Sequence, residues 1–309
     1  MPKVVVIAGP TASGKSALAI EVAQALNSVV LNCDSMQIYK DIPIISAAPS
    51  DSEKQKVEHR LYEIYDCSKR GNVVEWLDLC VAEIQKLWTE NKIPVVVGGT
   101  GMYIDALING VTPIPEVPTD IRVEVQQRLE RCGLEFLYDF LRQNDAPIAQ
   151  KLNPNDKTRI VRATEILLYT GKKVSEWYKM PMIKKLPEAE FLVVKIVPDI
   201  NVIEQRCRNR LDKMVELGAI KEVEYLAQQK IPESLPAMKT LGVPELMRFV
   251  KGKCSLEEAL SEAKLHTRQY AKRQRTWLRN KLPADIVFEE VYTGQPEYLN
   301  KIRQALSVL

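Results

Sequence analysis

Hydrophobic positions along the chain form two patterns, short continuous apolar runs and longer stretches with helical spacing. In the first third, apolar runs at residues 4–8, 29–32 and 94–97 alternate with helical patterns at 17–26 and 73–88. Near-continuous β-branched runs separated by helices are typical of a parallel sheet that is covered on both faces. The pattern therefore predicts an α/β fold.

The pattern changes after Gly110, where a proline-punctuated linker at residues 112–118 leads into a stretch without a convincing strand. Helical spacing continues to about Leu186, and the run 191–198 then returns as a buried-strand signal. From Asn201 onward the spacing is helical again. The middle of the chain is therefore expected to be a helical insertion into an α/β protein.

We expect the α/β core to comprise residues 1–116 and 189–309, and the helical insertion domain to comprise residues 117–188. Within the last helical region, Ser255 and Glu258 have the spacing of a capping box. This spacing predicts a helix that begins at this point. No internal repeat is present in the sequence.

The chain has 309 residues, of which 46% are hydrophobic and 27% charged, and this excludes collagen-like, low-complexity and disulfide-scaffold proteins. Its six cysteines are scattered without metal-ligand spacing and predict reduced thiols. The apolar run 4–8 is too short for a signal peptide, and no later run approaches the roughly 18 apolar residues of a membrane span. We therefore expect a cytoplasmic monomer with no membrane partner.

The first predicted strand is followed by a string that fits the G-x-x-x-x-G-K-[ST] pattern of a phosphate-binding loop, and a predicted helix follows it, as the pattern requires. Glycines let backbone N–H groups surround phosphates, a helix N-terminus favours negative charge, and lysine adds a positive charge. The serine hydroxyl is a ligand for Mg²⁺. We expect a di- or triphosphate site of the nucleotide- and ATP-binding type, with Ser16 on the metal, made of Gly9, Pro10, Thr11, Ala12, Ser13, Gly14, Lys15 and Ser16.

Two further polar residues follow predicted strands, Asp34 after the run 29–32 and Thr100 after the run 94–97. The carboxyl ends of parallel strands face the ligand crevice of an open α/β sheet, so both side chains should face the phosphates. The strand before Thr100 ends in glycines and lacks the acid that holds metal in an NTPase. Asp34 is a candidate for holding a metal or for accepting a proton, and the alternative is that it merely caps the next helix.

Five strings extend over almost the whole chain: the phosphate loop 9–16, Asp-Ser-Met-Gln-Ile-Tyr at 34–39, Gly-Gly-Thr-Gly-Met-Tyr at 98–103, Asn-Asp-Lys-Thr-Arg-Ile-Val-Arg-Ala at 155–163 and Thr-Arg-Gln-Tyr-Ala-Lys-Arg-Gln-Arg-Thr-Trp-Leu-Arg at 267–279. Together, and in this order, they resemble the bacterial tRNA dimethylallyltransferases, the IPP transferase family. The phosphate loop alone is unspecific, whereas the combination is known to us from no other family. The resemblance implies a P-loop-type parallel sheet core flanked by helices, with a helical insertion domain.

The resemblance implies a prenyl transfer, in which the N6 amine of the adenosine 3′ of the anticodon (position 37) attacks C1 of dimethylallyl diphosphate and diphosphate leaves. The phosphate loop then binds a diphosphate leaving group, whose charge Lys15 and Mg²⁺ neutralise. The family's general base falls on Asp34. Thr100 and Arg122 fall on positions that contact substrate near the reaction centre, and Arg122 is assigned to the diphosphate. The implied catalytic residues are Asp34, Thr100 and Lys15.

The resemblance also implies contacts with the tRNA anticodon stem-loop, whose target base is flipped out of the stack into a channel. The implied RNA contacts are Asp34, Ser35, Met36, Gln37, Thr100, Arg122, Thr158, Arg159, Ile160, Val161, Arg162, Lys239, Arg268, Lys272 and Arg275. The chain departs from the family pattern at Arg60, Ala48 and Val243, where many relatives have histidine, lysine and tyrosine. No role is carried over to these three residues.

The net charge of +3 hides an uneven distribution. Between Ala263 and Ala284 there is no acidic residue, and the seven basic residues of this segment leave the rest of the chain at −4. On a helix with about 100° per residue, five of them share one face within about 80°. Helices that face only solvent mix both signs of charge, so this face favours contact with RNA phosphates. The five are Lys264, Arg268, Lys272, Arg275 and Arg279.

Two alternatives to a tRNA-modifying prenyltransferase remain open at this point. The first is a small-molecule kinase of the nucleotide-kinase type, in which the loop binds ATP and Asp34 receives the acceptor's proton. The second is a non-catalytic RNA-binding protein with a phosphate loop. The basic helix favours RNA over a small acceptor, and the missing acid before Thr100 disfavours ATP hydrolysis. Tyr270 and Trp277, on the same helix, are expected to be packed rather than to stack on bases.

Overall fold

The computed structural model describes residues 2–308, which fall into two compact units. The first unit contains the chain up to Ile108 and from Lys185 onward, and the second unit is Asn109–Lys184. The second unit begins and ends a few residues earlier than the expected insertion at 117–188. Just before the predicted linker, Val111 forms an antiparallel bridge with Ile183 near the end of the unit.

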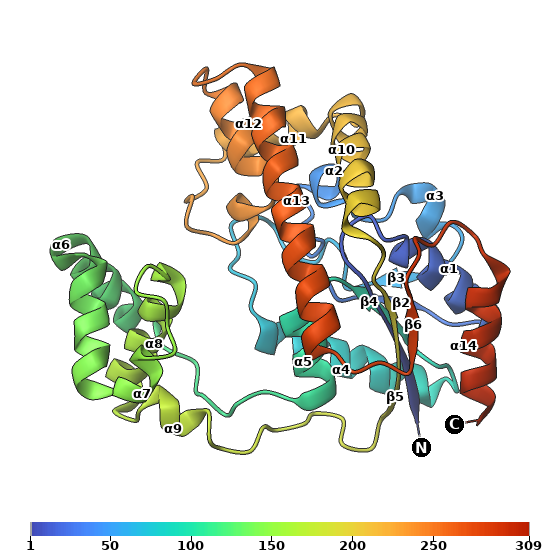
Figure 1. Ribbon diagram of the computed structural model, residues 1–309, viewed down its shortest axis with the longest axis horizontal. Coiled ribbons are helices and arrows are strands. Elements are labelled where there is room, and N and C mark those ends of the chain that lie inside the picture. The colour runs from blue at the N-terminus through green and yellow to red at the C-terminus, as the bar shows by residue number, and fades with distance from the viewer. Residues whose placement is uncertain (1, 309) are drawn as a thin grey trace. The chain divides into compact units, whose positions relative to one another are not determined.

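A six-stranded, all-parallel sheet forms the first unit, with the strand order β3-β2-β4-β1-β5-β6 (Figure 1). Its strands are β1 (Lys3–Ala8), β2 (Val30–Asn32), β3 (His59–Arg60), β4 (Val95–Gly98), β5 (Glu190–Ile196) and β6 (Ile286–Phe288). Strand β1 pairs with β4 on one side and with β5 on the other. The loop that follows β1 therefore emerges in the middle of the sheet's carboxyl edge.

Helices connect these strands and extend the unit beyond the sheet. They are α1 (Lys15–Ala25), α2 (Pro43–Ser46), α3 (Asp51–Lys54), α4 (Val73–Thr89), α5 (Gly101–Asn109), α10 (Ile200–Leu217), α11 (Ala219–Gln228), the 3-10 helix η1 (Ala237–Lys239), α12 (Val243–Val250), α13 (Leu256–Lys281) and α14 (Pro296–Val308). Helix α13 packs along α10 and α12, as Figure 1 also shows. None of the helices within residues 2–308 has the length and apolar character needed to cross a bilayer.

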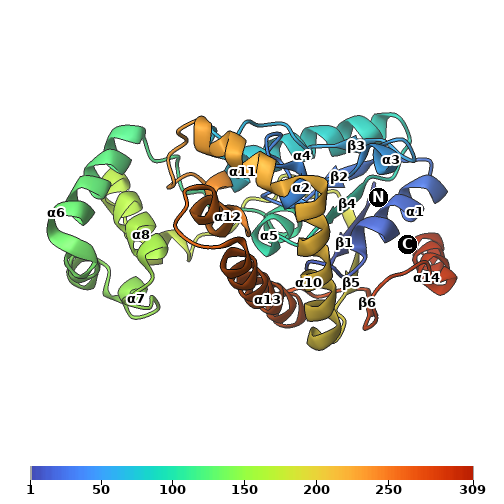
Figure 2. The ribbon, with the colours of Figure 1, turned by 90° about the horizontal axis from the view of Figure 1, so that it is seen from above.

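The sheet is buried on both faces, as its continuous apolar strands require. Val5 and Ile7 of β1 belong to the core formed with α1 and α14, whereas Val4 and Val6 point to the opposite face and are equally buried. The connections β1-α1-β2 and β3-α4-β4 cross the sheet in opposite directions. Right-handed crossovers therefore place α1 and α4 on opposite faces, as Figure 2 shows.

The second unit is all-helical and has a core of its own. Its helices are α6 (Thr119–Asn144), α7 (Ala146–Ala149), α8 (Lys157–Thr170) and α9 (Val174–Trp177). Helix α6 is interrupted at Gly133, which has a φ of 83°. Apolar side chains of α6 such as Leu137 and Leu141 pack against Ile160 and Ile166 of α8. The expected helical character of the insertion is thus present.

The predicted α/β class, with a parallel sheet flanked by helices, is confirmed. The four predicted strands are present with ends shifted by one or two residues, and the capping box of Ser255 and Glu258 forms at the start of α13. The prediction that only helices follow Asn201 is wrong at β6. The apolar run of this strand has only three residues, Ile286–Phe288, of which Val287 is exposed, so it is too short to predict a buried strand. The two-residue β3 was missed for the same reason.

Candidate active site

The phosphate loop, residues 9–16, connects the central strand β1 to α1. Gly14 caps α1 with a φ of 87°, and a Cβ at this position would lie 2.3 Å from the carbonyl oxygen of Tyr292, so both conformation and space require glycine. Ala12 also has a positive φ, 65°. The hydroxyl of Ser13 is buried and has no hydrogen-bond partner in the described part of the chain. The loop thus presents a helix N-terminus and an unsatisfied hydroxyl, groups that favour an anion.

Two cations lie near this loop. Burial lowers the pKa of Lys15 to about 8; Asp34 opposes this effect and Arg210 adds to it. Burial also lowers the pKa of Arg210, which lies on α10 and forms no hydrogen bond or ion pair within residues 2–308. Two desolvated cations close to each other are unfavourable without an anion, so the site is arranged for a negatively charged ligand.

Sequence reasoning did not find Arg210, because it lies in none of the recognised strings. The available signal was its spacing from Arg206, which is four residues earlier and therefore on the same side of α10. The Nε of Arg206 donates to the carbonyl oxygen of Ala12 at 2.9 Å. Helix α10 thus supports the phosphate loop from outside and adds a cation to it.

Asp34 follows β2 in a turn and does not cap a helix, so the capping alternative is wrong. Its N–H donates to Oδ1 of Asn32 at 2.8 Å, and its own Oδ1 accepts the N–H of Met36 at 3.0 Å. The fully buried Asn32 is itself fixed by the indole of Trp76, which donates to its carbonyl oxygen at 2.9 Å. Asp34 is half-buried, and its charge acts against the burial that lowers the pKa of Lys15. The carboxylate therefore lies within electrostatic range of the phosphate loop.

Thr100 follows β4 and lies beside the turn that contains Asp34. Its Oγ1 accepts the N–H of Ser35 at 3.0 Å and lies 3.3 Å from the Ser35 hydroxyl. The hydroxyl of Tyr270, on α13, lies close enough to Thr100 for the two side chains to interact. Burial raises the pKa of Tyr270 and the contact with Thr100 lowers it by less, so this hydroxyl stays neutral. The carboxyl ends of β1, β2 and β4 thus bring the phosphate loop, Asp34 and Thr100 together, as the strand positions predicted.

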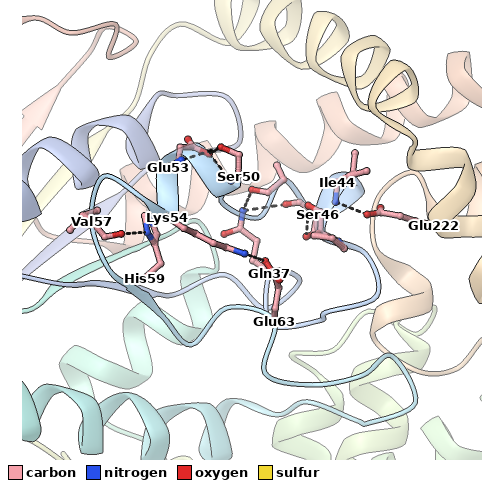
Figure 3. A network of polar contacts seen from close by, with 12 residues as sticks. Gln37, Ile44, Ser46, Ser50, Glu53, Lys54, Val57, His59, Glu63 and Glu222 are labelled. Atoms are coloured by element: carbon pink, nitrogen blue, oxygen red, sulfur yellow. Dashed lines mark hydrogen bonds and ion pairs between the residues drawn. The ribbon is translucent and has the colours of Figure 1, made fainter.

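The segment after Asp34 is held by the network of polar contacts in Figure 3. The Nε2 of Gln37 donates to two carbonyl oxygens at the end of α2, at 3.2 and 2.6 Å. At the start of α2, the N–H groups of Ile44 and Ile45 donate to the two carboxylate oxygens of Glu222, on α11, at 2.7 and 2.9 Å. Burial raises the pKa of Glu222, and these two hydrogen bonds oppose the rise. The predicted RNA-contacting segment is therefore tied to the helical part of the unit by a residue outside every recognised string.

The basic face of α13 packs partly on α10, which supplies the acids that residues 263–284 lack. Lys264 and Arg268 form ion pairs of 2.6 and 2.5 Å with acidic side chains of α10, and Arg275 donates to a backbone carbonyl just before α10 at 2.7 Å. The charges of Lys264 and Arg268 are thus already paired within the unit, and the RNA contact of this face stays a prediction. Lys272 and Arg279 are exposed and form no ion pair in the described part of the chain.

Arg122 and the predicted RNA contacts of α8 belong to the second unit. The Nε of Arg122 is buried without a partner among the described residues, and its Nη2 lies 3.5 Å from a glutamate of the same unit. Ile160 is fully buried in the unit's core, so its side chain offers no surface to RNA, and Val161 is half-buried. Besides Arg268 and Lys272 on α13, the exposed members of the predicted set are Thr158, Arg159 and Arg162 on α8, and Lys239 on η1 of the first unit.

Comparisons with known proteins indicate the family of this chain. Residues 37–281 match the family model described as IPP transferase. A tRNA dimethylallyltransferase of Nitrobacter hamburgensis is 40% identical over 279 residues, which cover 90% of this chain and 88% of that protein. Among solved structures, the full-length tRNA isopentenylpyrophosphate transferase of Bacillus halodurans aligns with a TM-score of 0.72 and 29% identity, covering 99% of this chain and 96% of that one.

A eukaryotic dimethylallyltransferase captured while acting on tRNA is also similar to this chain. It aligns with a TM-score of 0.82 and 32% identity, and the alignment covers 98% of this chain and 78% of that one. The family match extends over most of the chain, from within the turn that follows β2 to the end of α13. The chain belongs to the IPP transferase family, as the resemblance of its five strings implied.

Proposed function

We propose that this protein transfers a dimethylallyl group from dimethylallyl diphosphate to N6 of the adenosine 3′ of the tRNA anticodon and releases diphosphate. The observation that carries the proposal is the meeting of an anion-binding loop with Asp34 and Thr100 at the carboxyl edge of one sheet. Prenyl transfer to an amine needs a site for a diphosphate leaving group next to a proton acceptor. Relatives named tRNA dimethylallyltransferase support this assignment.

The phosphate loop is proposed to hold the diphosphate through the N-terminus of α1, the Ser13 hydroxyl and Lys15, with Arg210 approaching from α10. Negative charge on the leaving oxygen grows as its bond to C1 breaks. Cations and N–H groups that are already in place stabilise that charge without reorganisation. Arg122 stays a predicted contact of the diphosphate and of RNA.

Asp34 is proposed as the base that accepts the proton of N6, with Thr100 beside it as a contact for the acceptor. A neutral exocyclic amine becomes acidic only as its bond to carbon forms, so a carboxylate that acts late in the reaction suffices. The turn geometry of Asp34 leaves its second carboxylate oxygen without a hydrogen-bond partner among the described residues. That oxygen is available to the substrate amine.

Mg²⁺ fits the loop in combination with a diphosphate. No cluster of three or more His, Cys, Asp or Glu side chains is arranged for a metal ion within residues 2–308. Mg²⁺ is commonly bound through few protein oxygens together with substrate phosphates, and the exposed hydroxyl of Ser16, next to Lys15, is suited to this. When bound, the ion would neutralise charge on the leaving diphosphate.

One assay tests the proposed function. Purified protein, Mg²⁺, labelled dimethylallyl diphosphate and unmodified tRNA are expected to give label on N6 of the adenosine 3′ of the anticodon. A tRNA with guanosine at that position is the control and should stay unlabelled. Phosphorylation of a nucleotide by ATP without transfer of label to RNA would instead support a kinase. The predictions of a monomer and of a cytoplasmic location stay predictions.

Replacing Lys272 by alanine is expected to weaken binding of the anticodon stem-loop and to reduce the slope of log K against log salt by about 0.7–0.9, because one phosphate contact is lost. Lys264 is the matched control on the same helix, since its charge is already paired with an acid of α10. The slope of the Lys264→Ala variant should therefore change less. Binding measured by fluorescence anisotropy over a range of salt concentrations checks this, and equal slopes in both variants would contradict an RNA contact by Lys272.

A further inference from the structure

Gln274 lies in the C-terminal half of α13, at the centre of the unit, and only 6% of its surface is exposed. Its Oε1 accepts the N–H of Thr11 at 2.9 Å, and its Nε2 donates to the carbonyl oxygen of Gly99 at 2.8 Å. One buried amide thus joins the phosphate loop to the residue that precedes Thr100. No role has been assigned to Gln274 above.

The glycines of the turn after β4 allow this approach. A Cβ on Gly99 would lie 2.4 Å from Nε2 of Gln274, and a Cβ on Gly101 would lie 2.5 Å from the indole of Trp277. Because both distances are far below van der Waals contact, α13 approaches the turn this closely only where side chains are absent. The strings at 98–103 and 267–279 are therefore complementary surfaces that meet in space.

The connection reaches the acceptor side of the site through the turn after β4. Gly99, which accepts from Gln274, directly precedes Thr100. Thr100 in turn accepts the N–H of Ser35, next to Asp34. The hydrogen bonds of Gln274 and Thr100 therefore connect the phosphate loop, α13 and the turn that carries the proposed base.

We propose that Gln274 is a positioning residue that fixes the distance between the diphosphate in the phosphate loop and the acceptor amine beside Thr100. This inference rests on the proposed function and adds a residue that acts through other groups and does not touch substrate. Displacement at C1 needs the attacking nitrogen and the leaving oxygen on opposite sides of one carbon. Each substrate is held by a different loop, and Gln274 holds the two loops together.

A positioning role predicts that replacing Gln274 slows the transfer step and leaves the binding of both substrates nearly unchanged. Gln274→Leu removes both hydrogen bonds while the binding groups of each loop remain. We expect single-turnover transfer to slow by about 100-fold, because an error of about 1 Å in the relative position of two reactants has that effect. Binding of dimethylallyl diphosphate and of the anticodon stem-loop, measured separately by calorimetry, should change little. Gln269→Leu, at an exposed glutamine of the same helix, is the control and should match wild type.

A second variant keeps the test decisive if Gln274→Leu folds poorly. In Gln274→Glu, a protonated side chain both accepts from Thr11 and donates to Gly99, whereas the carboxylate only accepts. Its single-turnover rate relative to wild type should therefore rise as the pH falls. Tyr270, a titratable group one helical turn before Gln274, is neutral throughout that range because burial raises its pKa.

Four outcomes are informative. A normal rate for Gln274→Leu would overturn the positioning role, and so would a loss of rate that both binding affinities share in a variant of unchanged thermal stability. A pH-independent ratio for Gln274→Glu would overturn it as well. Wild-type protein that transfers no label to RNA would contradict the proposed function itself, whereas an active wild type alongside any of the preceding results contradicts only this inference.

Discussion

Replacing Asp34 by asparagine is expected to lower the turnover of prenyl transfer by about 10²- to 10⁴-fold, the usual contribution of a positioned acid or base. The amide retains an oxygen that accepts the N–H of Met36, so the turn after β2 keeps its geometry. The amide has no negative charge and is far too weak a base to take the proton of N6. Because the turn survives, binding of the anticodon stem-loop should be retained.

Single-turnover transfer of label and equilibrium binding of RNA, measured on the same preparations, check this expectation. Asp41→Asn is a matched control, because Asp41 also accepts a backbone N–H, that of Cys67 at 2.7 Å, without a place in the proposed chemistry. It should turn over like the wild type. Full turnover by the Asp34→Asn variant would show that Asp34 only shapes the turn, and another group would then have to accept the proton.

Elements with a strong local pattern could be predicted from the sequence. The strands β1, β2, β4 and β5 are continuous apolar runs because they are buried on both faces, and the start of α13 is set by the local hydrogen bonds of Ser255 with Glu258. Strands β3 and β6 are held by pairing with a neighbour that is distant in sequence. The two residues of β3 are polar and the apolar run of β6 has only three residues, so no local pattern reveals these strands.

The residues of the candidate site also differ in whether the sequence reveals them. The phosphate loop, Asp34 and Thr100 could be predicted because the carboxyl ends of parallel strands share one edge of the sheet, so a position after a strand implies a position in the fold. Glu222 and Gln274 act on loops from helices more than 170 residues away in sequence, and their partners are backbone groups, which leave no mark in the sequence. The ion pairs of Lys264 and Arg268 could not be predicted for a related reason, since the acids that pair with them lie on α10.

Replacing Lys15 by methionine is expected to lower kcat/KM for dimethylallyl diphosphate by about 10²- to 10³-fold, comparable to the loss of one preorganised group that stabilises transition-state charge. In the free protein, burial lowers the pKa of Lys15 to about 8. A bound diphosphate places negative charge beside the amine and raises its pKa again, so binding of the diphosphate takes up a proton when the amine is neutral. Below about pH 8 the Lys15 amine is already charged, so this group no longer makes the affinity for dimethylallyl diphosphate depend on pH.

Above that pH, the affinity for dimethylallyl diphosphate should fall as the pH rises, by up to about tenfold per pH unit. The fall ends at the pKa that Lys15 has in the complex. Lys15→Arg separates this effect from titration of the diphosphate, because a guanidinium stays charged throughout the range. The dissociation constant of dimethylallyl diphosphate, measured between pH 7 and 10, should therefore rise more steeply for wild type than for Lys15→Arg. Parallel curves would mean that Lys15 does not change its charge on binding. The loss expected for Lys15→Met would then have to come from the shape of the loop, and not from the charge that a buried amine supplies to the leaving group.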